Sequence, residues 1–373
     1  MRDISNREKL TLVGLVTFPD KKDREIADRL SLPNSTFASA KAKLMESGFV
    51  TEYFVPIFPK LGMELLAAVY SDFNPSVSVD ERVKNTKRTV EVYPEMILSL
   101  GESHRGFSLS VAQNITRIMR ISHERMRILA DLNLLEIELP IEVLFPFEIS
   151  EVHRYFNLAP LIFKKLKGSD PKLFEDIGLM GTELYEKDLL FPLPKNLAPI
   201  VPRDVDLTRK QLEILYYLVK YPSLSASKLA SLTGHSRHTV SRVKEMLIEE
   251  DYITALKMPD LSRLDYSILS LFHARMDPKN PLVSGVVKSR ELLQDDTIFL
   301  VRRPTEMIML AAYENYVQYN KGMSSFNQFL KGHDHLKMIP NIRNHSLSET
   351  IWIKRFEYHP LIRDTFGLMG LDK

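Results

Sequence analysis

Apolar residues recur at helical spacing near the start of the chain and again in its second half. The two stripes consist of Leu10, Val13 and Val16 and of Leu212, Leu215 and Val219. Ser5 with Glu8 precedes the first stripe, and Thr208 with Gln211 precedes the second. In such a capping box a hydroxyl accepts from a backbone N–H while the later side chain reaches back to the cap. The pattern predicts a helix that begins there in both halves.

Two shorter apolar patterns follow each stripe and predict a second and a third helix. Their core positions are Ile26, Ala27, Leu30, Phe37, Ala40 and Leu44 in the first half, and Leu229, Ala230, Thr233, Val240, Val243 and Leu247 in the second. The intervening turns contain Ser31 and Gly234. Small residues at these places suit a close helix crossing, so we expect a helix-turn-helix. Residues 49–55 and 252–258 alternate like strands and predict a wing or a lead-out hairpin.

The rest of each half alternates between strand and helix patterns. In the first half we expect strands at 65–73, 96–100, 107–111 and 134–141, with helices at 79–93 and 115–129. In the second half we expect strands at 268–276, 298–301, 307–313 and 336–340, with helices at 281–294 and 316–330. The order β-α-β-β-α-β is that of a ferredoxin-like module, and it places the chain in the α+β class.

The two halves are copies of one unit. Residues 27–51 align without a gap on residues 230–254, at a shift of 230 minus 27, or 203. Near the ends of the copies, Pro140 and Pro340 agree at a shift of 200. Duplication explains this register. We expect a winged helix-turn-helix at 1–56, a ferredoxin-like domain at 57–166, a proline-rich connector at 167–206, a second winged helix-turn-helix at 207–259, and a second ferredoxin-like domain with a C-terminal segment at 260–373.

Composition narrows the classes of function. The 373 residues are 44% hydrophobic, which is typical of a globular protein with two or three domains. The lack of cysteine excludes disulfides, thiolate metal sites and thiol nucleophiles. No apolar run spans a bilayer and the first residues are charged, so we expect a cytoplasmic protein without membrane association. The net charge is only +2, so any affinity for nucleic acid must come from local patches.

A winged helix-turn-helix followed by this module resembles the Lrp/AsnC (feast-or-famine) transcriptional regulators. Members of that family usually carry one copy and dimerise through their ferredoxin-like sheets. The resemblance therefore implies a covalent pseudo-dimer that binds double-stranded DNA and forms a homo-oligomer, a dimer. The family's effector pocket lies near a glycine-rich turn between the second and third strands. That turn is 101–106 here, and its counterpart at 302–306 has no glycine, so a small-molecule effector stays an open alternative.

The third helix of each reader is the candidate DNA-binding element, because such a helix lies in the major groove. The outward positions are Arg237, His238, Ser241, Arg242 and Lys244 in the second copy, and Asn34, Ser35, Ser39, Lys41 and Lys43 in the first. An arginine can present a bidentate fork to guanine or phosphate. Pro33 stands where Ser236 provides an N-cap in the second copy. We therefore expect the second reader to contribute more of the attraction.

We interpret other conspicuous residues as structural and not as parts of a functional site. We interpret His333 and His335 as a polar loop, since no third metal ligand follows at a defined spacing. We interpret His104 and Arg105 as a plain turn, with anion or effector binding as the alternative. The helix that carries Arg117, Arg120, Arg125 and Arg127 is expected to be a solvated basic face, with contact to the DNA backbone as the alternative. The aromatic repeat at 154–162 and 355–362 forms either an interdomain or dimer contact or, preferably, a segment packed on its own sheet.

These patterns favour a sequence-specific transcriptional regulator that is not an enzyme and has no catalytic residue, cofactor or metal. The alternative is an enzyme on the same scaffold. Siroheme decarboxylases resemble Lrp/AsnC proteins in fold but are not regulators, and catalysis would require converging His, Tyr or Arg side chains between the sheets. A third alternative is an assembly scaffold that has lost DNA binding in one copy.

Overall fold

The computed structural model describes residues 4–102, 104–135, 138–175, 181–192, 205–282 and 292–371. Helices and antiparallel sheets alternate along the chain, so the expected mixed α+β class is confirmed. Residues 283–291, which fall in the helix expected at 281–294, lie outside the described residues, as do parts of the expected connector.

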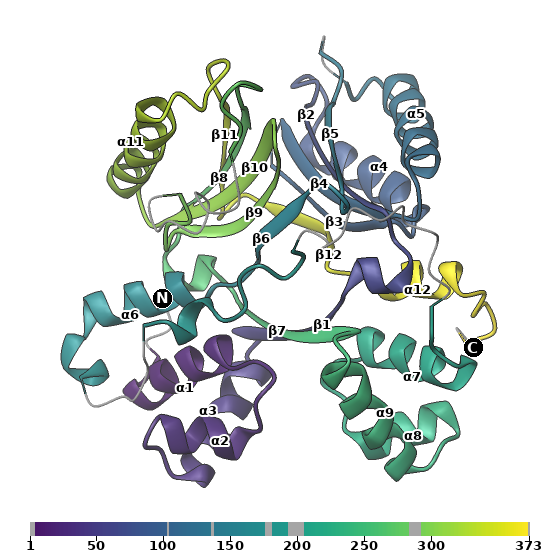
Figure 1. Cartoon of the computed structure of the whole chain (residues 1–373), viewed down its shortest axis with the longest axis vertical. Helices are drawn as coiled ribbons and strands as arrows, with labels where there is room; N and C mark the ends of the chain where they lie inside the picture. The colour runs from purple at the N-terminus through teal and green to yellow at the C-terminus, as the bar shows by residue number, and fades with distance from the viewer. Residues whose placement is uncertain are drawn as a thin grey trace. The chain divides into compact units, whose positions relative to one another are not determined.

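The chain divides into two compact units that each combine segments of both halves. Unit 1 consists of residues 1–52, 150–192 and 255–348, and unit 2 consists of residues 53–149, 193–254 and 349–373. Each unit contains one three-helix bundle and one five-stranded sheet (Figure 1). The bundle of a unit and four of the five strands of its sheet come from different copies of the repeat.

The bundle of unit 1 contains α1 (Asn6–Thr17), α2 (Asp23–Arg29) and α3 (Asn34–Glu46), and that of unit 2 contains α7 (Arg209–Lys220), α8 (Ala226–Thr233) and α9 (Arg237–Glu249). Both expected capping boxes are present. Gly234 ends α8 with φ of 69°, while Ser31 adopts φ of 53° after α2. Serine tolerates that left-handed backbone less readily than glycine, so the two turns differ in strain.

The sheet of unit 2 has the order β12-β3-β4-β2-β5. Its strands are β2 (Leu65–Asp72), β3 (Met96–Gly101), β4 (Arg105–Ala112), β5 (Ile141–Pro146) and β12 (Ile351–Arg355). Helices α4 (Val79–Glu91) and α5 (Ile115–Asp131) lie against this sheet, and α12 (His359–Thr365) packs against α7. The strands at 65–73, 96–100 and 107–111 were correctly predicted, because each is a short, almost continuously buried run.

The sheet of unit 1 has the order β11-β8-β10-β9-β6. Its strands are β6 (Glu151–Tyr155), β8 (Ile268–Arg275), β9 (Thr297–Arg303), β10 (Glu306–Tyr313) and β11 (Asn341–Ser346). Helix α11 (Tyr316–Gly332) packs against β10, and α6 (Ala159–Ser169) packs against α1. A core of buried apolar side chains fills the face of the sheet that α11 covers.

The aromatic repeat was assigned to the wrong sheet. Strand β6 comes from the first copy but pairs with β9 of the second copy, and β12 comes from the second copy but pairs with β3 of the first. The preferred prediction that each segment packs on its own sheet is therefore wrong. The physical reason is that an edge strand offers the same backbone groups to either sheet, so its local pattern does not choose the partner.

Two further predictions need correction. The last strands begin after Pro140 and Pro340, at 141–146 and 341–346, whereas Leu135 and Leu336 form only isolated bridges. The segments expected as wings are β1 (Val50–Pro56) and β7 (Ile253–Pro259), which pair with each other instead of closing local hairpins. Short 3₁₀ turns at Phe58–Leu61 and Ser262–Leu264 follow them, with others at Pro171–Phe174 and Glu183–Tyr185.

Candidate functional site

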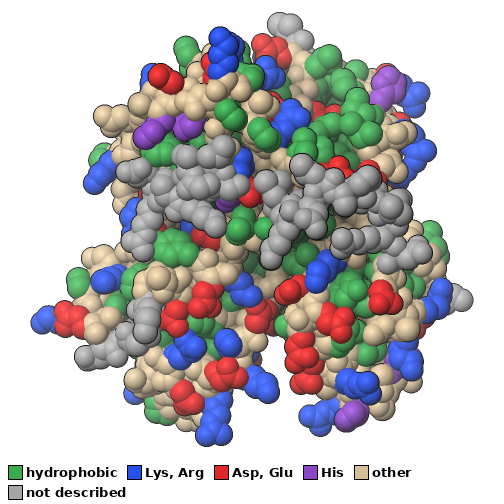
Figure 2. Space-filling view, in the orientation of Figure 1, with side chains coloured by type: hydrophobic (Ala, Val, Ile, Leu, Met, Phe, Trp, Pro, Cys, Tyr) green, Lys and Arg blue, Asp and Glu red, His purple; other side chains and the backbone are tan. Residues whose placement is uncertain are grey.

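The predicted DNA-contacting residues of the second copy lie on α9 of unit 2. Ser236 caps this helix, since its hydroxyl accepts from the backbone N–H of Thr239 at 3.1 Å. Arg237, His238 and Arg242 are exposed and Ser241 is half-buried. Figure 2 shows basic and histidine side chains at the tip formed by α8 and α9, with acidic side chains near them. Lys244 differs, because its ammonium lies 4.7 Å from the centre of the Phe54 ring.

The predicted residues of the first copy lie on α3 of unit 1 and offer less positive charge. Asn34, Ser35 and Ser39 are exposed. The ammonium of Lys41 contacts the Asp23 carboxylate at 2.7 Å, and that of Lys43 lies 3.8 Å from the Glu8 carboxylate. Pro33 supplies no side-chain cap to α3. Both lysines thus face local acidic partners.

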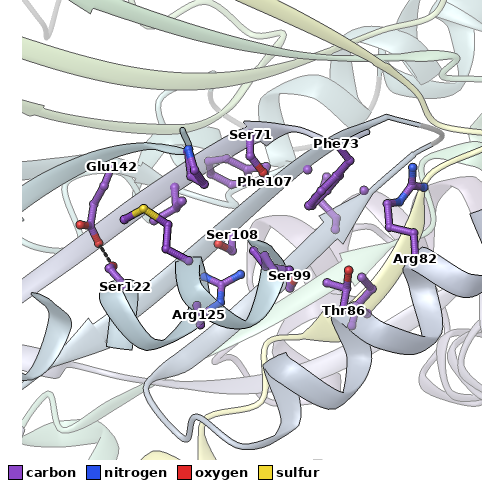
Figure 3. Close-up of a pocket in the computed structure, with 18 of the residues that line it drawn as sticks. Ser71, Phe73, Arg82, Thr86, Ser99, Phe107, Ser108, Ser122, Arg125 and Glu142 are labelled. Carbon is purple, nitrogen blue, oxygen red and sulfur yellow. Dashed lines mark hydrogen bonds between the residues drawn. The ribbon is translucent and has the colours of Figure 1, made fainter. Parts of the chain in front are cut away.

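A pocket in unit 2 forms between the sheet and the two helices α4 and α5 (Figure 3). Its cavity volume is about 50 Å³. Since one water requires roughly 10–15 Å³ of such volume, the cavity has room for a few waters or for one small polar group. Gly101 and Gly106, from the turn where the resemblance implied an effector pocket, line it, but no sequence pattern had indicated its arginines or serines.

Three serines line the sheet side of the pocket. Ser99 on β3 pairs with Ser108 on β4, and Ser71 on β2 pairs with Gly106 on β4. Because side chains alternate along a strand, these positions all face the helices. Ser99 and Ser108 are both only 4% exposed. Buried hydroxyls at places where a sheet normally buries apolar side chains suit a polar ligand better than a core.

Arg125 on α5 approaches the pocket from the helix side, below Ser99 and Ser108 (Figure 3). Its Nε is buried and has no hydrogen-bond partner among the described residues. Burial lowers the pKa of Arg125 to about 10, although Tyr93 and Glu142 electrostatically favour the charged form. The guanidinium is therefore still a cation at neutral pH, and its Nε–H has no hydrogen-bond acceptor among the described residues.

Arg82 on α4 supplies a second cation. It is 3% exposed, and its Nη1 has no hydrogen-bond partner within the described part of the chain. Burial lowers the pKa of Arg82, and the nearby Glu102 opposes that shift. The guanidinium carbon lies 5.4 Å from the centre of the Phe73 ring. A Cβ at Gly106 would come within 2.6 Å of that ring, so glycine is required there to let Phe73 support the arginine.

An acidic group completes the pocket. The hydroxyl of Ser122 on α5 donates to the carboxylate of Glu142 on β5, as the dashed line in Figure 3 marks. Thr86 on α4 adds a buried hydroxyl without a hydrogen-bond partner among the described residues. The pocket thus combines two cationic donors, several hydroxyls and one carboxyl group, which together can hold a carboxylate and exchange a proton with it.

The interpretation of the arginine helix as a solvated face is wrong for Arg125. Arg120 and Arg127 are exposed, and Arg117 pairs with Glu95. Arg125 points instead into the pocket because it lies one turn after Ser122 on the face that α5 presents to the sheet. Serines at alternating positions of apolar strands were the sequence signal that could have revealed this site.

In the described part of the chain, no helix is long and apolar enough to cross a membrane. The same residues contain no cluster of three or more His, Asp or Glu side chains that could hold a metal ion.

The fold and this pocket define a mixed α+β protein. No family model and no curated protein matches the sequence. Among solved structures, the siroheme decarboxylase NirDL is similar over 98% of this chain and 100% of its own, at 10% identity and a TM-score of 0.47. NirDL in complex with an iron-uroporphyrin III analogue is similar over 93% of both chains, at 9% identity and a TM-score of 0.44.

A transcriptional regulatory protein of the AsnC family from Pyrococcus furiosus covers 39% of this chain and 90% of its own, at 16% identity and a TM-score of 0.28. The expectation that the chain is not an enzyme is overturned, since the solved structures that extend over nearly its whole length are those of an enzyme.

Proposed function

We propose that the chain is an enzyme that binds a carboxylate side chain of a small molecule in the unit 2 pocket and removes it as CO₂. This is the siroheme decarboxylase-like alternative. The observation that carries the proposal is that Arg82 and Arg125 each hold a buried nitrogen without a hydrogen-bond partner among the described residues. A carboxylate is the ligand that satisfies such donors, because it accepts several charge-assisted hydrogen bonds at once.

The size of the cavity limits what enters it. About 50 Å³ suits one carboxylate and the carbon that bears it, so the body of a tetrapyrrole would remain outside the cavity. Ser99 and Ser108 are placed to orient such an arm from the sheet side. The finer assignment of both sheets as ferredoxin-like belongs to this proposal, and the strand orders in the two units support it.

The reaction breaks the bond between the carboxylate and its carbon, releases CO₂, and requires a proton at that carbon. Burial disfavours the charged carboxylate relative to neutral CO₂. Glu142 is the acid that lines the pocket, and its contact with the Ser122 hydroxyl provides a route for the proton. In this proposal the arginines position the substrate, and Glu142 first takes up a proton from water through the Ser122 hydroxyl and then delivers it to the carbon that loses CO₂.

The test is anaerobic incubation of the protein with siroheme, followed by mass spectrometry of the tetrapyrrole. We expect loss of CO₂ from the substrate with the wild type. Arg125→Met should abolish this loss, while Arg127→Met, an exposed arginine on the same helix, should not. An unchanged tetrapyrrole with folded wild-type protein would refute the proposal, as would full activity in Arg125→Met. An absorbance spectrum of the purified protein checks for a tetrapyrrole that is already bound.

A second candidate function is sequence-specific binding of double-stranded DNA by a dimer, with transcriptional regulation as its consequence. The observation that favours it is the exposed basic start of α9, where Arg237, His238 and Arg242 lie. For neither arginine is an ion pair present among the described residues. In the first reader the lysines have acidic partners, which supports a larger contribution from the second reader.

Gel shifts on genomic fragments test this second function. Arg237→Ala with Arg242→Ala should remove binding and reduce its dependence on salt, because phosphate contacts release counterions. Lys21→Ala, an exposed change outside α3 and α9, serves as the control. Binding that persists unchanged in the double variant would exclude α9 as the reading helix.

A further inference from the structure

The duplication gives the pocket positions of unit 2 matched counterparts in unit 1. Strand β4 begins at Arg105 and β10 at Glu306, and α5 begins at Ile115 and α11 at Tyr316, both at a shift of 201. The strand pairing agrees with this register. Ser99 pairs with Ser108 in unit 2, and Leu300 pairs with Met309 in unit 1.

The counterparts of the four pocket serines and of Arg125 are apolar, whereas the residues that match Arg82 and Thr86 fall within 283–291, outside the described residues. Phe326 stands at the position of Arg125, Met323 at that of Ser122, and Met309 at that of Ser108; the remaining pairs are Leu300 for Ser99, Ala274 for Ser71 and Phe272 for Val69. All six of these residues belong to one buried cluster in unit 1. The rings of Phe272 and Phe326 meet edge to face with centroids 4.6 Å apart. Among the described residues of unit 1, apolar side chains therefore occupy the positions whose counterparts line the cavity in unit 2.

From this contrast we infer that the chain holds one carboxylate-binding site, in unit 2, and that the matching place in unit 1 is its closed counterpart. The inference rests on the proposed function for the class of ligand. Phenylalanine in place of arginine removes the N–H donors that a carboxylate requires, and methionine in place of serine fills the space that the ligand would occupy. The duplicated scaffold thus keeps one copy as a packed core and the other as a site.

Arg125 is the residue that distinguishes the two places most sharply. It is the pocket residue whose counterpart changes from a cation to an aromatic ring, and its Nε is buried without a hydrogen-bond partner among the described residues. Arg82 adds a second cation from α4. We therefore assign to Arg125 the contact with one oxygen of the ligand carboxylate, with the serines of β3 and β4 on the opposite side.

The number of sites is tested by calorimetric titration of the full chain with iron-uroporphyrin III and, separately, with acetate as a small carboxylate. We expect one equivalent bound per chain. Arg125→Phe, which places the unit 1 residue in unit 2, should weaken binding by about 100-fold, since losing a buried charge-assisted contact has an effect of that order. Its melting temperature should be unchanged or higher. Phe326→Leu in unit 1 is the control and should bind as the wild type does.

Ser108→Met is a second closing variant, and it serves if Arg125→Phe does not fold. Two equivalents per chain, wild-type affinity in both closing variants, or no binding of either probe would each overturn the inference. Binding of one equivalent without release of CO₂ from siroheme would refute the proposed function and leave the inference intact. The two failures are therefore distinguishable.

Discussion

The helix-covered faces of the two sheets bury different kinds of side chain. In unit 1, Phe326 and its neighbours form a continuous apolar core. In unit 2, the matching face keeps two arginines whose buried nitrogens lack hydrogen-bond partners among the described residues. Polar groups in that state oppose folding. After duplication, one copy of the unit can stabilise the fold while the other contains a binding site whose buried polar groups lower stability.

Truncating the paired residues should have opposite effects on stability. Phe326→Ala leaves a cavity in the core of unit 1 and should lower the free energy of unfolding by about 3–5 kcal/mol. Arg125→Ala removes a desolvated cation and should change that free energy little or raise it. Urea unfolding of both variants measures the difference. Equal destabilisation by the two changes would contradict the contrast between a core and a site.

The two edge strands provide a second comparison. Arg154 on β6 is fully buried, binds the carboxylate of Asp188 through two nitrogens, and donates to two backbone carbonyls. Asp188→Ala leaves that cation unpaired and should destabilise the fold by about 3–5 kcal/mol.

Lys354 on β12 is the control for that prediction. Burial lowers its pKa, and its ammonium donates to the Tyr93 carbonyl at 3.3 Å. Lys354→Met should therefore be nearly neutral in thermal unfolding. A larger loss of stability for Lys354→Met than for Asp188→Ala would reverse the assignment of which edge strand depends on an ion pair.

Acid should affect the sheet of unit 1 through Glu306. Burial acts to raise the pKa of Glu306, but hydrogen bonds from His273 and Arg303 prevail and lower it from 4.5 to about 2. The folded state therefore prefers the carboxylate. The resulting stabilisation, roughly 2–3 kcal/mol, is present above pH 4.5 and disappears as the pH falls toward 2. The unit 2 counterpart is Arg105, which contributes no such carboxylate.

The measurement is the free energy of unfolding between pH 2 and pH 7 for the wild type and for Glu306→Gln. The variant should show a smaller decline between pH 4.5 and pH 2. Parallel curves for the two proteins over this window would show that another group governs the acid response.

The smallest expected effect concerns the reading helices. Ser236→Ala removes the hydroxyl that caps α9 and should lower the free energy of unfolding by about 1 kcal/mol. Pro33 stands at the N-cap of α3 and makes no side-chain hydrogen bond to the helix. Pro33→Ala therefore removes no such bond and should lower the free energy of unfolding by less. Circular dichroism during thermal unfolding distinguishes these outcomes. A loss for Pro33→Ala that matches or exceeds the loss for Ser236→Ala would contradict the difference between the caps.

The sequence predicted those elements that local periodicity and capping chemistry determine. The capping boxes at Ser5 and Thr208 and the end of α8 at Gly234 are local features, and the structure contains all three. The exchange of β6 and β12 was missed because strand pairing over such a distance leaves no local trace. The pocket was missed because an arginine on an amphipathic helix has the same pattern whether it faces water or a ligand. The match of Arg125 with Phe326 reveals the difference, as do the serines at alternating positions of β3 and β4.

A crystal structure of the protein with bound iron-uroporphyrin III tests the central claim most directly. We predict one bound molecule per chain, with a carboxylate of the ligand in hydrogen-bond contact with the guanidinium of Arg125 in unit 2. The side chains around Phe326 should pack as they do without ligand. A carboxylate bound elsewhere, with the guanidinium of Arg125 left unpaired, or a second ligand in the core of unit 1, would contradict it.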